Sequence, residues 1–158
     1  MKGNQTVIDR LNETLVSEFT AIHQYFVHAE MEENWGYKKL AEYVKKQSIG
    51  EMKHAEKLIE RILFLDGVPS MGELKPLTIG QDVKTQLDAD LALEYEAVQQ
   101  LNAAIADAVA AGDNGSREMF EQILTDEEEH VDWLEAQLQA IADIGIGLYL
   151  AQQLETDD

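Results

Sequence analysis

Two glutamate–histidine steps with the spacing Glu-x-x-His begin at Glu51 and Glu127, on two stretches of sequence that both read as long helices. Residues three positions apart on a helix project from nearly the same face, so each step offers one carboxylate and one imidazole side by side. The histidines that complete the steps are His54 and His130. A fold for this chain must therefore bring two helices together along polar positions inside an otherwise apolar interface.

Two further glutamates stand alone inside the apolar stripes of other predicted helices. The apolar residues around them repeat every three or four positions, which is the spacing of a buried helix face. These stripes are Leu11, Leu15 and Ile22 around Glu18, and Leu87, Leu91 and Val98 around Glu94. Two lone carboxylates and two Glu-x-x-His steps, one from each of four helices, make the six-ligand set of a two-metal site in a bundle.

The hydrophobic periodicity predicts an all-α fold with one domain over residues 1–158. The sequence has only 2 prolines, and it holds no alternating run that favours a strand. A long connection from Ser70 to about Asp82 is expected to cross the full length of the bundle between the second and third helices. Ser116 is expected to cap the fourth helix. The predicted helices cover residues 7–34, 37–65, 83–111 and 116–143, with a short fifth helix at 146–153.

The six ligand candidates all lie on the inward faces of the predicted helices, where burying a carboxylate without a partner costs several kcal/mol. Four carboxylates gathered there would also repel one another, and these faces carry no lysine or arginine to balance them. Two divalent cations would solve both problems. Oxygen-rich ligands with one imidazole per metal favour iron or manganese, with zinc as an inhibitor at the same positions.

The expected roles within this set differ. We expect Glu51 and Glu127 to bridge two irons and hold them close enough to deliver two electrons to one bound oxygen molecule. The remaining ligands, one carboxylate and one imidazole for each iron, are Glu18, His54, Glu94 and His130. Tyr25 lies two turns from Glu18 on the same stripe; it either donates an electron or a hydrogen bond to the site, or only packs in the core.

The charge of the chain narrows the possible partners. The formal net charge is −19 at pH 7, which argues against a nucleic-acid partner because phosphate binding needs a basic face. An acidic surface steers cations or simply keeps the protein in solution. There is no cysteine, and no stretch is apolar enough to span a membrane. A cytoplasmic protein with no membrane partner is therefore expected.

Six segments, spread over nearly the whole chain, carry a family resemblance. They are residues 1–3 (MKG), 21–26 (AIHQYF), 34–36 (NWG), 51–55 (EMKHA), 60–65 (ERILFL) and 126–132 (DEEEHVD). In these segments the chain resembles the bacterioferritins. The resemblance implies a ferritin-like four-helix bundle that forms a hollow shell of twenty-four subunits, oxidises Fe(II) with O2 or H2O2, and stores the ferric mineral inside. All six ferroxidase positions match: Glu18, Glu51, His54, Glu94, Glu127 and His130.

The resemblance also implies a haem cofactor. The chain departs from the family pattern in two places. Met52, one from each subunit of a twofold pair, would hold a shared haem b, although a methionine beside Ile49 is otherwise typical of interface packing. Lys46 and Gly50 stand where some members have a histidine and an aspartate, so an inner-surface iron site is doubtful. Lys45, where an aromatic residue often borders the haem, either pairs with a haem propionate or is solvated.

Several alternatives stay open from the sequence. One alternative is a haem-free ferritin of the same fold. An alternative from another class of protein is a di-iron oxygenase or peroxidase without mineral storage. A DNA-protecting mini-ferritin is disfavoured by the missing basic tail, and a purely structural bundle by its inward carboxylates. A second subunit type in the shell and a ferredoxin-type reductant for iron release are also open.

Overall fold

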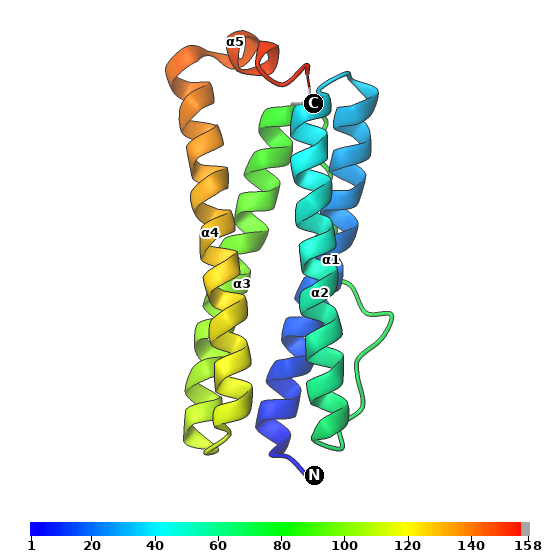
Figure 1. The fold of residues 1–158 in the computed structure, drawn as a ribbon, viewed down its shortest axis with the longest axis vertical. Helices are drawn as coiled ribbons and strands as arrows, with labels where there is room; N and C mark the ends of the chain where they lie inside the picture. The colour runs from blue at the N-terminus through cyan, green and yellow to red at the C-terminus, as the bar shows by residue number, and fades with distance from the viewer. Residues whose placement is uncertain (156–158) are drawn as a thin grey trace.

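A computed structural model describes residues 1–155 as five helices, and contains no strand within that range. The last three residues of the predicted domain, 156–158, lie outside the described residues. Figure 1 shows four long helices side by side, with the fifth lying across the end of the bundle where α4 ends. The helices are α1 (Gln5–Asn34), α2 (Lys38–Phe64), α3 (Val83–Ala110), α4 (Asn114–Ile144) and α5 (Ile146–Ala151). This arrangement confirms the predicted all-α bundle with a short fifth helix.

Side-chain caps explain where three of the long helices begin. The Asn4 side chain accepts a hydrogen bond from the Val7 amide at 3.2 Å at the start of α1. Asp82 forms a capping box with Thr85 at the start of α3, and each such cap satisfies amides that have no partner inside the helix. The expected cap of α4 at Ser116 is wrong, because Asp113 holds that position and accepts from the Ser116 amide at 2.9 Å. α4 therefore begins at Asn114.

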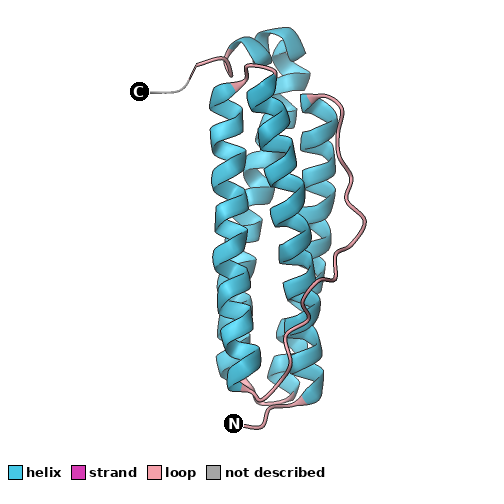
Figure 2. Ribbon diagram, turned by 90° about the vertical axis from the view of Figure 1, so that its right-hand side faces the viewer, coloured by secondary structure: helices cyan, strands magenta, loops and turns pink. Residues whose placement is uncertain are grey.

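The long connection between α2 and α3 runs along the outside of the bundle from one end to the other (Figure 2). Polar side chains on one face of α1 hold the connection there, because they accept hydrogen bonds from the backbone amides of the connection. These pairs are Ser70 with Asn12 at 2.7 Å, Lys75 with Thr20 at 3.0 Å, Thr78 with Gln24 at 3.1 Å and Gly80 with His28 at 3.0 Å. The connection returns the chain to the starting end of α2, so α1 and α3 run antiparallel (Figure 1).

The apolar core consists of two clusters, one toward each end of the bundle. One contains Leu15, Ala55, Leu101 and Ile123, and the other contains Ala21, Val44, Leu87 and Leu134. On every long helix, the six ligand candidates fall in sequence between residues of these two clusters. The clusters thus cover a polar layer from both ends, and water is kept away from it in both directions. No helix within residues 1–155 is long and apolar enough to cross a membrane.

Candidate metal centre

The polar layer gathers all six ligand candidates from four different helices. Each of the six is at most 6 % exposed, although charged side chains are almost never buried to this extent without a partner. α1 contributes Glu18 and α3 contributes Glu94, while α2 and α4 each contribute one complete Glu-x-x-His step. The structure therefore brings together the residues that the sequence pattern singled out.

Within this layer the ligand atoms form two overlapping groups, and in each group the atoms lie within 4.8 Å of one another. One group is Glu18, Glu51, His54 and Glu127; the other is Glu51, Glu94, Glu127 and His130. Glu51 and Glu127 belong to both groups. A carboxylate with two oxygens can bind a cation on each side, so this shared position is the one that a bridging ligand requires.

Burial and crowding change the acidity of these carboxyl groups. Burial, with the charge of Glu127 as a second cause, raises the pKa of Glu18 from 4.5 to about 7. Burial also raises the pKa of Glu51 and Glu127 well above their usual range. The pKa of Glu94 is lowered despite its burial, because Glu127 and His130 donate hydrogen bonds to it. Without a bound cation, the layer therefore holds protons in place of positive metal charge.

The hydrogen bonds of this layer are incomplete, which provides a test of whether cations fit. Four buried atoms of this layer lack a hydrogen-bond partner among residues 1–155, namely Glu18 Oε2, His54 Nδ1, Glu94 Oε2 and Glu127 Oε1. All four belong to the two groups of ligand atoms, and buried polar atoms are otherwise almost always paired. A divalent cation in each group would give these oxygens and nitrogens a partner, so the donor set fits two such ions.

The two ring nitrogens of His54 face opposite surroundings. Its Nδ1 lies 3.1 Å from Glu127 Oε1 and 3.5 Å from Glu18 Oε2, inside the site. Its Nε2 lies 2.7 Å from Asp126 Oδ2 on the rim, where the Asp126 side chain is 57 % exposed. Burial lowers the pKa of His54, but the nearby carboxylates of Glu127 and Glu18 outweigh it and raise that pKa. Asp126 thus orients the ring so that Nδ1 points at the site.

Tyr25 and His130 complete the opposite side of the centre. The Tyr25 hydroxyl donates a hydrogen bond to Glu94 Oε1, and His130 Nδ1 lies 3.0 Å from the same oxygen. The two rings meet edge to face, with centroids 5.3 Å apart. Burial and the charge of Glu94 raise the pKa of Tyr25 well above 10. Tyr25 is therefore a neutral phenol that contacts the site directly and does more than fill the core.

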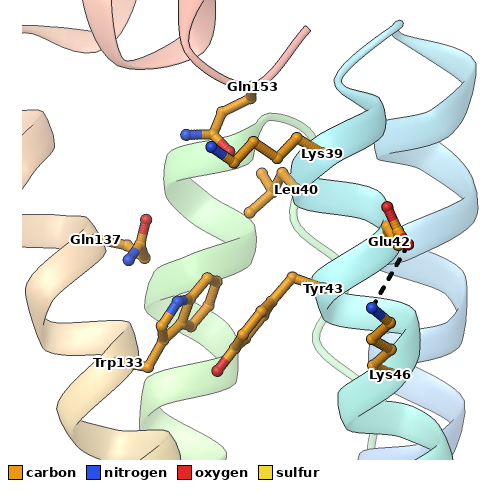
Figure 3. Close-up of a pocket in the computed structure, with 8 residues that line it drawn as sticks. All are labelled: Lys39, Leu40, Glu42, Tyr43, Lys46, Trp133, Gln137 and Gln153. Atoms are coloured by element: carbon orange, nitrogen blue, oxygen red, sulfur yellow. Dashed lines mark ion pairs between the residues drawn. The ribbon is translucent and has the colours of Figure 1, made fainter. Parts of the chain in front are cut away.

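A small pocket leads from the centre to the surface between α2 and α4. Its volume is ≈ 270 Å³, and its walls include Glu51, His54 and His130 from the site together with Asp126 at the rim. Lys46 and Gly50, the positions of the missing inner-surface iron site, also line it. Next to it lies a second pocket of ≈ 440 Å³, where Tyr43 of α2 stacks on Trp133 of α4 at 3.9 Å between centroids (Figure 3).

Met52 lies on α2 outside the metal centre. Its side chain is 54 % exposed, although it directly follows the buried Glu51. Two other large apolar side chains, Phe26 and Ile49, are also about half exposed. Lys45 pairs with Glu30 at 3.9 Å. Met52 is thus available to a group bound outside this chain and cannot contribute to the dinuclear site.

The residue that sequence reasoning missed is Asp126. Asp126 directly precedes Glu127, and the helical pattern assigns the acidic residues around Glu127 to a solvated face. Three of these acidic residues are exposed in the structure, namely Glu128, Glu129 and Asp132. The only available signal was its place in the family segment 126–132. Its contact with His54 depends on how α2 and α4 pack, which periodicity within one helix does not reveal.

Comparison with known proteins agrees with the fold. Residues 8–144 match the family model of the ferritin-like domain. The chain is 47 % identical over 152 residues to the bacterioferritin of Mycolicibacterium paratuberculosis, with 96 % of each protein covered. It is 44 % identical to that of Streptomyces coelicolor, with 98 % of this chain and 93 % of the relative covered.

A solved structure of a mycobacterial bacterioferritin superposes with a TM-score of 0.96 at 46 % identity, covering 97 % of this chain and 95 % of the other. The similarity therefore extends beyond the motifs to the path of the whole backbone. It confirms the resemblance seen in the sequence: the chain belongs to the bacterioferritins, within the ferritin-like family.

Proposed function

We propose that this protein stores iron, and that each chain oxidises Fe(II) to Fe(III) at the buried centre before the ferric product joins a mineral inside a shell of twenty-four subunits. The observation that carries the proposal is the pair of overlapping four-ligand groups sharing Glu51 and Glu127. A bundle with no use for cations would not bury four carboxylates together. Membership of the bacterioferritins supports the storage role.

Fe(II) is the substrate, and each ion supplies one electron to the oxidant, O2 or H2O2. Glu51 and Glu127 are the proposed bridging ligands, with Glu18 and His54 on one ion and Glu94 and His130 on the other. Two cations would match the charge of the four carboxylates. They would also displace the protons that Glu18, Glu51 and Glu127 hold in the metal-free protein, because ligands bind metal in their deprotonated forms.

The residues around the ligands control orientation and access. Asp126 holds the His54 ring with its Nδ1 toward the centre, and Tyr25 holds one oxygen of Glu94 through its hydroxyl. A phenol at this position can also give up an electron to the oxidant, as the sequence suggested. The net charge of −19 supports attraction of Fe(II) toward the protein, because acidic surfaces concentrate cations.

The haem proposal rests on Met52. A thioether suits a soft metal centre, and an exposed apolar surface suits a flat hydrophobic cofactor. Met52 would hold haem b at a twofold interface, with the partner subunit supplying the second ligand. The half-exposed Phe26 and Ile49 provide matching apolar surface. A second subunit type, a ferredoxin-type reductant and a cytoplasmic location stay predictions from the sequence.

A di-iron oxygenase or peroxidase without a mineral store is the competing function. The pocket beside the centre is small and is lined mainly by polar and charged side chains, including Lys46, Asp126 and Glu129. Sites for organic substrates are mostly apolar, so this pocket favours the passage of ions.

The test is rapid Fe(II) oxidation by ligand variants. Glu18→Ala and His130→Ala should abolish rapid oxidation while the shell still assembles, because each removes one terminal ligand. Glu128→Ala is the matched control, since it removes an exposed carboxylate next to the ligand Glu127. Initial rates are measured by ultraviolet absorbance of the ferric product, and assembly by light scattering. Unchanged initial rates in both ligand variants would rule out this site assignment.

A further inference from the structure

The pocket drawn in Figure 3 differs in charge from the rest of the molecule. Its walls carry two lysines, Lys39 and Lys46, and a single carboxylate, Glu42. Two positive charges and one negative leave a formal charge of +1, in a chain whose net charge is −19. Lys46 pairs with Glu42 at 3.5 Å, which leaves the Lys39 ammonium without an ion pair among residues 1–155. The pocket therefore offers a positive charge to a ligand.

The carboxamide of Gln137 turns its donor groups toward the same pocket. Tyr149 of α5, which is buried, donates a hydrogen bond to Gln137 Oε1 at 2.8 Å. This bond fixes which end of the amide is the oxygen, so the two N–H groups on Nε2 are left for other partners. In Figure 3, Nε2 lies on the side of the amide that faces Trp133. Gln137 thus presents N–H donors to the pocket.

Trp133 adds another donor and part of the pocket floor. Its ring stacks on Tyr43 with 3.9 Å between centroids, and the buried Leu40 extends this apolar floor. The indole nitrogen lies on the edge of the ring that faces Gln137 (Figure 3). An indole N–H can donate a hydrogen bond but cannot accept one. The neutral polar groups of Trp133 and Gln137 are therefore both directed as donors.

The segment after α5 holds this arrangement together at its upper side. The Lys39 amide donates to the Gln153 carbonyl oxygen at 3.0 Å, and the side chains of both residues line the pocket. An ammonium group and several N–H donors around one space favour an oxyanion, because such donors form strong charge-assisted hydrogen bonds with anionic oxygens. The volume of ≈ 440 Å³ is ample for a phosphate ion with some of its water.

This pocket shares a wall with the small pocket that leads to the metal centre. Tyr43 and Lys46 line both of them. The pocket at the centre also contains the carboxylates of Asp126 and Glu129, so it suits a cation, whereas the pocket in Figure 3 suits an anion. Fe(III) prefers oxygen ligands, and phosphate supplies them. An anion in the second pocket would thus lie beside the path of an iron ion that leaves the centre.

We propose that the pocket in Figure 3 binds inorganic phosphate through Lys39, Trp133 and Gln137, and that the bound phosphate receives Fe(III) from the metal centre. The transfer rests on the proposed function, whereas the binding site does not. The transfer is a ligand exchange without a change of oxidation state. Bonds from Fe(III) to carboxylate oxygens break, bonds from Fe(III) to phosphate oxygens form, and a proton lost by phosphate passes to water.

The binding site is tested by calorimetric titration of the iron-free, full-length protein with inorganic phosphate. We expect saturable binding to the wild type. Lys39→Gln should weaken it about tenfold, the lower range for the loss of a hydrogen bond to a charged group. Gln137→Glu should abolish it, because a carboxylate replaces the N–H donors at the same size. Lys38→Gln is the matched control, since it removes the same charge from an exposed neighbour that lines a different pocket.

A further variant separates the donor from the aromatic stack. Trp133→Phe keeps a ring to stack on Tyr43 but lacks the N–H group, so it should also weaken phosphate binding. Absence of saturable binding to the wild type would overturn the site. An equal loss in Lys38→Gln and Lys39→Gln would overturn it as well, because net charge alone would then attract the anion.

The transfer is tested by two successive additions of Fe(II), each matched to the capacity of the dinuclear site, with and without phosphate. The first addition should be oxidised equally fast by the wild type and by Gln137→Glu. Phosphate should speed the second oxidation in the wild type alone, because Fe(III) must first leave the centre. An equal effect of phosphate on both proteins would overturn the transfer. A wild type that binds phosphate but does not oxidise Fe(II) would overturn the proposed function, and the transfer with it.

Discussion

Replacing Glu18 with glutamine should have opposite effects on the stability of the metal-free and the metal-loaded protein. Folding raises the pKa of Glu18 from 4.5 to about 7, so the folded state holds its proton more tightly than the unfolded chain. This group therefore destabilises the fold increasingly as pH rises from about 4.5 to about 7, and by a constant amount above that range.

The size of the effect follows from the pKa shift. The difference is about 2.5 pH units, and each unit corresponds to 1.36 kcal/mol, so Glu18 costs the metal-free protein about 3 kcal/mol at pH 8. Glu18→Gln removes this cost. For a chain of this length, about 3 kcal/mol corresponds to a rise of roughly 6 to 12 °C in the unfolding temperature. With Zn²⁺ present, the order should reverse, because the variant lacks one ligand and gains less stability from binding.

The assay is differential scanning calorimetry at pH 8 of wild type, Glu18→Gln and the exposed-site control Glu128→Gln, each without metal and with excess Zn²⁺. Zinc is used because it binds the same kinds of ligand without redox chemistry. All samples have one protein concentration, since the midpoint of an oligomer depends on it. A metal-free Glu18→Gln no more stable than the wild type would refute the burial argument. An equal gain from Zn²⁺ in both proteins would refute the role of Glu18 as a ligand.

Three further substitutions test other parts of the account. Asp126→Asn should weaken Zn²⁺ binding by about tenfold, as measured by calorimetric titration, because it removes the charge that orients the His54 ring; wild-type affinity would exclude that role. Met52→Leu should abolish the haem absorbance band while rapid Fe(II) oxidation continues, and a retained band would rule out Met52 as the haem ligand. Arg61→Ala should lower the unfolding free energy by about 2 to 3 kcal/mol, because a half-buried guanidinium loses its bond to Asp113 at 2.7 Å; a thermal midpoint equal to the wild type would contradict this.

Most of the fold and the ligand set could be predicted because the relevant signals are local. Glu18 and Glu94 stand out against apolar neighbours spaced by a helical turn, and each Glu-x-x-His step is complete within one helix. A glutamate at a position where the helical pattern expects an apolar residue was enough to indicate a buried carboxylate. The long crossover followed from its length and its two prolines.

What could not be predicted depends on contacts between segments. Glu32 lies in the acidic end of α1, and only the folded structure shows that it is buried. Asp113 and Ser116 are both good helix caps, and the local backbone rather than residue type decides between them. The contact of Asp126 with His54 could be recognised only from the packing of α2 against α4. For Glu32 and Asp126, the physical signal is a neighbour distant in sequence.

The most direct test of the central claim is aerobic loading of the metal-free protein with Fe(II), followed by removal of loose metal and a count of the iron retained per chain. We expect tens of irons or more per chain, since only a closed shell with a mineral store can hold so many. Retention of about two per chain, the capacity of one dinuclear site, would contradict storage and favour an oxygenase or peroxidase.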